Sequence, residues 1–192
     1  GAFSGAQILR NDPPDRYVFN YRASYGEETA ALVHYFVSVL GITPKNIAVF
    51  YQDDSFGRDG LTGVANAIDQ YGASLNDLST ASYQRNSTRV MNAIALLRPE
   101  IHHLEGIIIV GTYPASSRFI KLMRINGYQG HFANVSFVGS AALAEELRES
   151  DNNGGEGVII SQVVPMYDAY ASGVLEYQQA MKQHFPTEQP GF

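Results

Sequence analysis

The feature that most constrains the fold is a regular alternation of short apolar runs with longer segments of helical periodicity. Five runs rich in apolar residues are predicted to be strands, at residues 46–51, 73–78, 106–111, 131–137 and 158–164. A near-continuous apolar run, as at 46–51, is typical of a parallel strand covered on both faces. Strands that alternate with helices through short loops predict an α/β fold, a three-layer Rossmann-like parallel sheet with helices on both faces.

The segments between these runs carry helix signals. Ser24 followed by Glu27 has the spacing of a capping box, which predicts that a helix begins at Ser24. Leu61, Val64 and Ile68 repeat at the spacing of a buried helix face. Two further helices are predicted to begin at residues 87 and 114, and a short one to include residues 143–147. The last predicted helix has residues 170, 174, 177 and 181 on one face.

Three loops are the expected ligand-binding positions. In parallel sheets of this kind, ligands bind at the carboxyl ends of the strands, near the point where the strand order reverses. The residues that directly follow predicted strands are 52–57, 112–115 and 136–140. We therefore expect the functional side chains in these three loops.

Composition excludes several classes of protein. The 192 residues carry a formal net charge of −6 with a pI near 5.3, so no nucleic acid is expected as a partner. The absence of cysteine excludes disulfides, thiol catalysis and thiolate metal sites. No apolar run approaches the ~18 residues of a membrane span. Because the sequence opens with GAFSG, without an initiator Met, and stops just after a predicted helix, we expect an internal piece of a longer protein.

Motifs of nucleotide-binding proteins and of hydrolases are missing. The sequence contains neither a Walker A loop nor a Gly-x-Ser-x-Gly nucleophile elbow. Gly57, Gly60 and Gly63 are three apart and lie within a predicted helix, which is not a dinucleotide-binding fingerprint. No pair among the five histidines has the i, i+4 spacing of a helical zinc site. We expect no catalytic residue, no cofactor and no metal site.

An acidic cluster after the first long strand has two interpretations. Asp53, Asp54 and Asp59 resemble a divalent-metal or phospho-acceptor site, but the further acidic pair and the lysine of a receiver domain cannot be placed. Alternatively, Asp53 or Asp54 caps the helix that begins near Ser55, where the helix dipole favours a carboxylate. The cap is the favoured interpretation.

The remaining side chains at the strand ends are aromatic or carry a hydroxyl. They are Phe56, Thr112, Tyr113, Ser136 and Phe137. A mostly apolar wall with a few hydroxyl groups suits the binding of a small solute. Acid–base catalysis would instead require carboxylates or histidines at these positions.

Four stretches resemble one known family over essentially the whole chain. They are GAFSGA at 1–6 with YVFNYR at 17–22, IAVFYQDDSFG at 47–57, IIVGTYP at 108–114, and SFVGS at 136–140 together with GVIISQVVP at 157–165. In combination they resemble the type I periplasmic solute-binding proteins of ABC transporters, specifically the leucine/isoleucine/valine-binding branch.

The resemblance implies two α/β lobes with a ligand held in the cleft between them. Residues 1–20 would end the first lobe, residues 21–163 would form the second ligand-binding lobe, and residues 164–192 would return toward the first. The implied function is capture of an amino acid or related carboxylate in the periplasm, without catalysis, for delivery to the membrane subunits of an ABC transporter. The same fold also serves as the ligand-sensing domain of membrane signalling receptors, and this alternative stays open.

The resemblance also implies positions for ligand contacts. The family binds the ligand carboxylate with a hydroxyl and backbone amides after a first-lobe strand, and Ser4 occupies the hydroxyl position beside Ala2 and Phe3. Phe56 stands where the family has an aromatic residue on the second lobe. Arg22 and Tyr25, near the crossing between lobes, are further predicted contacts.

The other second-lobe positions include one departure from the family. Thr112 and Tyr113 stand where the family often has a tyrosine. Ser136 stands where amino-acid binders place an acidic residue for the ligand ammonium. Because a buried ammonium without a counter-charge costs several kcal/mol, this serine favours a carboxylate without an α-amino group, unless Asp53 or Asp54 substitutes.

Overall fold

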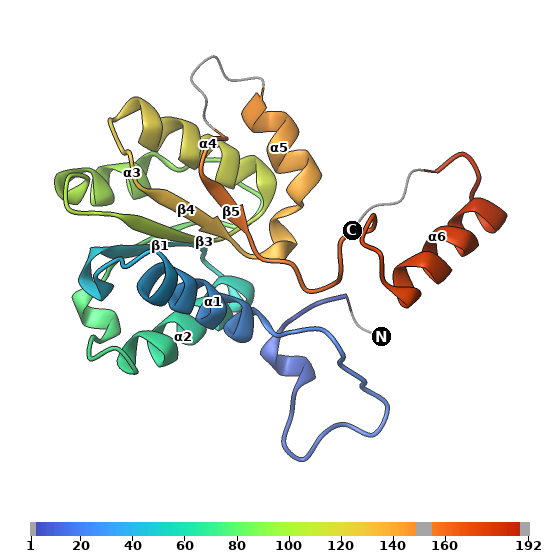
Figure 1. Cartoon of the computed structure of the whole chain (residues 1–192). Coiled ribbons are helices and arrows are strands. Elements are labelled where there is room, and N and C mark those ends of the chain that lie inside the picture. Colours follow the sequence, from blue (N-terminus) through green and yellow to red (C-terminus); the bar gives the residue numbers. More distant parts are fainter. Residues whose placement is uncertain (1–2, 149–154, 189–192) are drawn as a thin grey trace. The chain divides into compact units, whose positions relative to one another are not determined.

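The structure is a computed structural model that describes residues 3–148 and 155–188, and the statements below concern these residues. The chain divides into two compact units, Gly1–Ser161 and Gln162–Phe192 (Figure 1). The longer elements of the first unit are α1 (Tyr25–His34), β1 (Ile47–Gln52), α2 (Ser55–Asp69), β2 (Ser79–Tyr83), α3 (Met91–Leu97), β3 (Gly106–Val110), α4 (Tyr113–Ile125), β4 (His131–Asn134), α5 (Ser140–Arg148) and β5 (Val158–Ile160). The second unit contains α6 (Ser172–His184).

Short helical segments complete the first unit. A π-helical segment, Tyr35–Val39, continues α1. The described residues also form 3₁₀ helices at Gln7–Leu9, Pro44–Asn46, Leu75–Asp77, Arg98–Glu100 and Ser136–Val138. No helix in the described part of the chain combines the length and the apolar composition that a membrane span requires.

The five strands form one parallel sheet in the order β2-β1-β3-β4-β5. The register places Val49 opposite Ile108, and Ile108 opposite Ala133. From β1 the chain first adds β2 on one side and then adds β3 on the other, so the strand order reverses between β1 and β3. The carboxyl ends of these two strands are therefore the expected position of a ligand.

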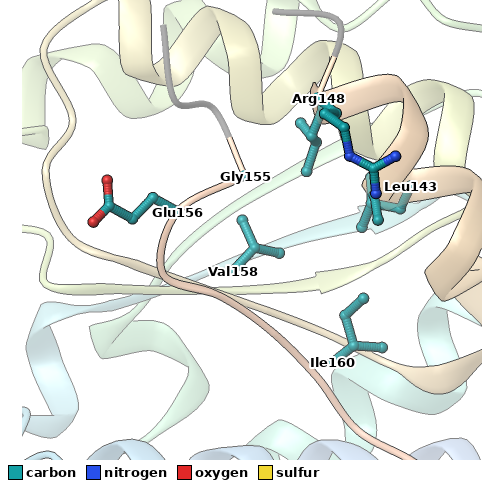
Figure 2. Close-up of a pocket in the computed structure, with 8 residues that line it drawn as sticks. Leu143, Arg148, Gly155, Glu156, Val158 and Ile160 are labelled. Atoms are coloured by element: carbon teal, nitrogen blue, oxygen red, sulfur yellow. The ribbon is translucent and has the colours of Figure 1, made fainter.

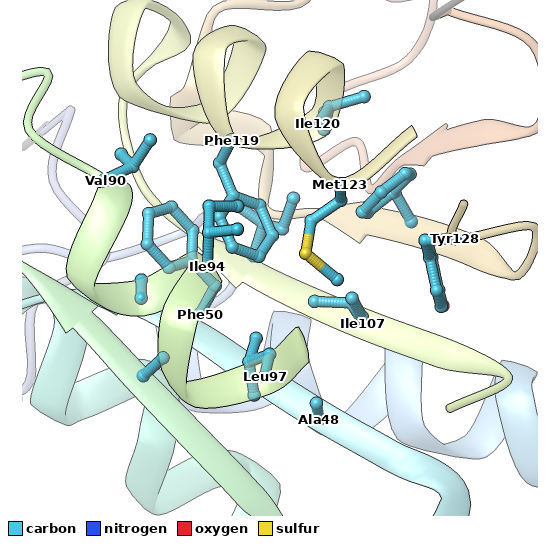
Figure 3. Packing of buried hydrophobic residues seen from close by; sticks show 14 of the residues in the cluster. Ala48, Phe50, Val90, Ile94, Leu97, Ile107, Phe119, Ile120, Met123 and Tyr128 are labelled. Atoms are coloured by element: carbon cyan, nitrogen blue, oxygen red, sulfur yellow. The ribbon is translucent and has the colours of Figure 1, made fainter. Parts of the chain in front are cut away.

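Helices cover both faces of the sheet, as the alternation predicts (Figure 1). One face packs against α1 and α2 through a buried cluster that includes Val33, Val49, Val64 and Ile108. The opposite face packs against α3, α4 and α5. In that second core, the rings of Phe50 and Phe119 stack with centroids 3.9 Å apart, and Figure 3 shows them among the surrounding aliphatic side chains. The predicted three-layer α/β fold is confirmed.

Three strand predictions differ from the structure. The predicted strand at 73–78 is wrong because Ser74 and Asp77 form a reciprocal capping box around a short 3₁₀ helix, and the strand begins only at Ser79. β4 stops at Asn134 because residues 136–138 turn into a 3₁₀ helix. β5 is limited to Val158–Ile160, because its partner β4 ends at Asn134, the residue paired with Ile160.

The helix predictions hold with shifted ends. α3 begins at Met91 rather than at Ser87, whose hydroxyl accepts a hydrogen bond from the Arg89 N–H at 3.1 Å instead of capping the helix. Gly57, Gly60 and Gly63 lie inside α2, as expected. α6 begins at Ser172, after the predicted Tyr170.

The capping box at the start of α1 is confirmed. The Ser24 hydroxyl accepts a hydrogen bond from the Glu27 N–H at 3.1 Å, and the Glu27 carboxylate accepts hydrogen bonds from the Ser24 N–H at 2.7 Å and from its hydroxyl at 2.8 Å. These hydrogen bonds from Ser24 lower the pKa of Glu27 below its usual value.

Replacing Ser24 by alanine should lower the free energy of unfolding by about 1 kcal/mol at pH 7. The lowered pKa of Glu27 makes its carboxylate stabilising above the ordinary glutamate pKa of about 4.3, and this contribution is lost as the pH falls below that value. Urea denaturation of the wild type and of Ser24→Ala should therefore show a stability difference that shrinks between pH 7 and pH 3. An equal difference at both pH values would contradict the assignment.

Candidate ligand-binding site

A cavity of about 520 Å³ lies at the carboxyl edge of the sheet, where the strand order reverses. β1 and the start of α2 line it with Gln52, Asp54, Ser55 and Phe56. The loop after β3 and the start of α4 contribute Thr112 and Pro114, and the loop after β4 contributes Phe137. All three predicted strand-end loops therefore meet in one cavity.

Aromatic rings form one wall of this cavity. The centroids of the Tyr25 and Phe56 rings lie 4.6 Å apart in an edge-to-face arrangement, and those of Phe56 and Phe137 lie 5.2 Å apart. α1, α2 and the loop after β4 each contribute one ring, so the wall joins elements that are distant in the sequence. Such a wall offers flat apolar surface with few polar atoms to desolvate.

The N-terminal segment closes one side of the cavity with Ser4 and Ala6. It is attached to α1, because the Tyr25 N–H donates to the Gly5 carbonyl at 3.0 Å. The Ser4 hydroxyl oxygen accepts from the Ala6 N–H at 3.2 Å and lies 3.4 Å from the Tyr25 hydroxyl. It therefore stands at the cavity beside the aromatic wall.

The opposite side is polar and follows β2. Arg85, Asn86, Ser87 and Thr88 line the cavity there. Asn86 has a left-handed backbone with φ of 58°, a conformation that asparagine tolerates better than most residues. The strand was predicted at 73–78 instead of Ser79–Tyr83. The residues that follow the true carboxyl end of β2 were therefore not predicted as ligand contacts.

A chain of hydrogen bonds runs along the base of the polar side. The Thr112 N–H donates to the Tyr83 hydroxyl at 3.1 Å, and this hydroxyl donates to Gln52 Oε1 at 3.0 Å. Gln52 Nε2 then donates to Asp54 Oδ2 at 2.7 Å. Burial raises the pKa of Tyr83, so its hydroxyl stays protonated and available as a donor at neutral pH.

The acidic cluster is explained by the helix cap. Asp54 is the N-cap of α2, where its Oδ1 accepts from the Gly57 N–H at 3.2 Å. Asp53 instead pairs with Arg58 at 2.9 Å, and both side chains are more than half exposed. Within the described residues, no group of three or more His, Cys, Asp or Glu side chains is placed to hold a metal ion.

Ser136 lies beside a buried ion pair that the sequence analysis did not predict. Arg22 Nη2 lies 2.7 Å from Glu28 Oε1, and the two side chains are 6% and 2% exposed. The other carboxylate oxygen of Glu28 accepts from the Ser136 N–H at 2.8 Å and from the Ser161 hydroxyl at 2.6 Å. Arg22 also donates to the Ser136 hydroxyl at 3.1 Å and to the Phe3 carbonyl.

The predicted contact residues are only partly gathered in the cavity. Ser4, Tyr25, Phe56 and Thr112 line it. The other described positions lie around it. The Phe3 ring lies 5.7 Å from that of Phe137 and is largely exposed, and Tyr113 begins α4 half-exposed. Arg22 does not line the cavity and instead forms the buried ion pair with Glu28, which Ser136 joins. Ala2 lies outside the described residues.

A second cavity, of about 600 Å³, lies at the edge of the sheet beside β5 (Figure 2). Its lining includes the apolar residues Leu143, Leu147, Val158 and Ile160 together with Arg148 and Glu156. It contains none of the strand-end residues at the reversal of strand order and no aromatic wall. The cavity at β1 and β3 is therefore the better candidate site.

Comparison with known proteins agrees with this architecture. A family model described as periplasmic binding protein matches residues 2–191. No curated protein matches the chain in sequence. A possible leucine/isoleucine/valine-binding protein from Rhodopirellula baltica SH 1 is 38% identical, with a TM-score of 0.89, over 100% of this chain and 50% of that structure.

Two more distant structures share the fold. A substrate-binding periplasmic protein from Ralstonia solanacearum has a TM-score of 0.78 at 22% identity, over 100% of this chain and 51% of that one. A branched chain amino acid ABC transporter protein from Thermus thermophilus with bound valine has a TM-score of 0.74 at 17% identity, over 95% of this chain and 45% of that one. The chain spans about half the length of these structures. Since the family model matches nearly every residue, the chain belongs to the periplasmic binding protein family.

Proposed function

We propose that this chain forms part of a protein that reversibly captures a small organic solute, an amino acid or a related carboxylate, for delivery to an ABC transporter. The observation that carries the proposal is the cavity at the reversal of strand order, with an aromatic wall on one side and hydroxyl and amide groups on the other. A small-molecule site typically combines a mostly apolar lining with a few polar groups that fix orientation.

The lining supports binding rather than catalysis. Asp54 is the one carboxylate that the described residues place in it, and this group already caps α2 and accepts from Gln52. No histidine, lysine or cysteine is among the described residues that line the cavity. A general acid or base must reach the proton that it transfers, and an Asp54 held in this way favours a structural role.

The ligand carboxylate is proposed to bind at Ser4. The Ser4 hydroxyl is at the cavity, accepts from the Ala6 N–H and lies 3.4 Å from the Tyr25 hydroxyl, so its proton can turn from Tyr25 toward a bound carboxylate. A hydrogen bond to a charged acceptor contributes about 1.5–3 kcal/mol. Ala2 and Phe3 complete this proposed subsite, as the family resemblance implies.

The environment of Ser136 supports a ligand without an α-amino group. The carboxylate near this serine belongs to Glu28, and its charge is neutralised by Arg22 at 2.7 Å. An ammonium placed there would meet both a positive guanidinium and a carboxylate that is already paired. Desolvating such a charge without a free partner is costly.

The wider proposal follows the two-lobed architecture of the family. Residues 1–20 and 164–192 would belong to the first-lobe side, and residues 21–163 to the second lobe. Closure of two such lobes around a ligand is a hinge motion that needs no covalent chemistry. The protein would act in the periplasm and dock on the membrane subunits of the transporter.

A thermal-shift screen of the full-length protein tests this function. The panel would hold branched and aromatic amino acids, their deaminated carboxylates, and short amides. Ligand at about 100 times its dissociation constant should add about 2.7 kcal/mol, seen as a rise in Tm of several degrees. We expect deaminated carboxylates to give larger shifts than the corresponding amino acids.

Paired serine variants serve as the control. Ser4→Ala should weaken binding of the active compound about 10- to 100-fold, which corresponds to one hydrogen bond to a charged acceptor. Ser38→Ala removes a hydroxyl that lies outside the cavity, where it contacts Tyr71 at 3.0 Å, and should leave the affinity unchanged. A panel in which no carboxylate or amino acid raises the Tm would contradict the proposed ligand class.

A further inference from the structure

Among the described residues, Arg85 is the one cationic side chain on the cavity wall. It lies in the turn after β2, on the polar side, while Ser4 lies in the N-terminal segment. Its polar contact within the described residues is a long ion pair, with Nε 3.9 Å from Asp54 Oδ2. That separation exceeds hydrogen-bond distance, so the five N–H donors of the guanidinium are not used within the described residues.

Asp54 does not require Arg85 as a partner. Its two carboxylate oxygens already accept from the Gly57 N–H at 3.2 Å and from Gln52 Nε2 at 2.7 Å, at the positive end of α2. The orientation of the Gln52 amide is fixed at both ends. Its Nε2 must donate to Asp54, because a carboxylate can only accept, and its Oε1 accepts from the Tyr83 hydroxyl, which in turn accepts from the Thr112 N–H. The aspartate is therefore stabilised by its own helix, and the guanidinium is left to face the cavity.

We propose that Arg85 is a specificity-determining residue that binds a second anionic group of the ligand, so that the protein prefers small dicarboxylates. This inference rests on the proposed function, in which the first carboxylate binds at Ser4. Arginine suits the role because its planar fork can hold a carboxylate through two parallel hydrogen bonds. The aromatic wall of Tyr25, Phe56 and Phe137 would contact the carbon chain between the two carboxylates.

The exposure of Arg85 fits a ligand contact better than a structural contact. Its side chain is 71% exposed, and an ion pair with such an exposed group contributes little to folding stability. A ligand that excludes water from the cavity would considerably strengthen the electrostatic attraction between this guanidinium and an anionic group of the ligand. Removal of Arg85 should consequently affect binding much more than folding.

Calorimetric titration of the full-length protein with glutarate and pentanoate tests the proposal, because these two acids share a five-carbon chain and differ by one carboxylate. The wild type should bind glutarate about 10- to 100-fold more tightly than pentanoate. Arg85→Gln should abolish this preference by weakening glutarate while leaving pentanoate unchanged. Arg85→Lys, which keeps the charge but not the fork, should retain part of it.

Arg58→Gln is the matched control, because it removes the same charge near the same helix. Arg58 pairs with Asp53 outside the cavity lining, and this variant should keep the full preference for glutarate. An unchanged ratio in Arg85→Gln, or a wild type that binds pentanoate at least as well as glutarate, would overturn the role of Arg85 while leaving the carboxylate-binding function intact. A wild type that binds neither acid, and no other carboxylate or amino acid, would overturn both.

Discussion

Replacing Arg22 by methionine should lower the free energy of unfolding by about 3–5 kcal/mol. The change removes the partner of Glu28 at 2.7 Å and leaves a carboxylate with a 2% exposed side chain without its counter-charge. The hydrogen bonds from the Ser136 N–H and the Ser161 hydroxyl remain, but neither carries a positive charge. Urea denaturation followed by circular dichroism at pH 7 measures the loss.

Two further variants separate burial of the charge from the mere loss of an ion pair. Arg58→Met breaks an exposed pair with Asp53 and should cost no more than about 1 kcal/mol. Combining Arg22→Met with Glu28→Gln removes the uncompensated charge and keeps an acceptor for Ser136, so at least half of the lost stability should return. Equal costs for Arg22→Met and Arg58→Met would show that the buried pair has no special role.

This ion pair also affects the candidate site. Arg22 and Glu28 hold together segments that lie far apart in the sequence, since they contact the Phe3 carbonyl, Ser136 and Ser161. Arg22 also lies over the ring of Tyr25, with its Cζ atom 5.6 Å from the ring centroid. Arg22→Met should therefore disturb the aromatic wall and the N-terminal side of the cavity together.

The sequence predicted the parts of the fold that depend on local patterns. The apolar runs of β1 and β3, the buried face of α2 and the capping box of Ser24 and Glu27 are all signals within a few residues, and each is present in the structure. The strand before Tyr83 was misplaced because Ala73 and Leu78 are buried, as in a strand, although the residues between them form a 3₁₀ turn. Local composition did not distinguish a strand from a 3₁₀ turn with buried residues on either side.

The candidate site was less predictable because it is assembled from distant segments. The loops after β1 and β3 were found from the general rule for parallel sheets, whereas Arg85 was missed along with the true end of β2. The partnership of Glu28 with Ser136 joins residues 108 positions apart. No spacing rule predicts such a contact. The sequence therefore showed that Ser136 replaces the acidic residue of amino-acid binders, but not that the carboxylate beside it comes from Glu28.

The three glycines of α2 show the same limit. Their placement inside a helix was predicted, but the surfaces that they approach come from elsewhere in the chain. A Cβ on Gly60 would lie 2.7 Å from a side-chain atom of Val110 in β3, and one on Gly57 would lie 1.8 Å from the Gln52 carbonyl. The glycines allow α2 to pack closely against its neighbours.

Gly63→Ala should accordingly lower the free energy of unfolding by about 3 kcal/mol, the upper part of the range for overpacked cores. The added Cβ would lie 2.3 Å from Thr29 Oγ1 and 2.4 Å from Gly26 Cα, so α1 and α2 must separate. Thr29 cannot turn away without cost, because its buried hydroxyl donates to the Gly60 carbonyl at 2.9 Å. The measurement is the urea midpoint of the variant against that of the wild type.

Gly173→Ala in α6 is the matched control for this substitution. No heavy atom lies within 4 Å of the position that its Cβ would occupy, so the higher helix propensity of alanine should leave stability unchanged or raise it by up to about 1 kcal/mol. Both substitutions restrict the unfolded chain equally, and their difference therefore reports the native contact. If Gly63→Ala proved as harmless as Gly173→Ala, the close approach of α1 and α2 would not be a constraint. If Gly63→Ala is destabilising, ligand affinity should fall as well. Separation of α1 from α2 would also part the Tyr25 ring, carried by α1, from the Phe56 ring, carried by α2, and these rings form the aromatic wall of the cavity.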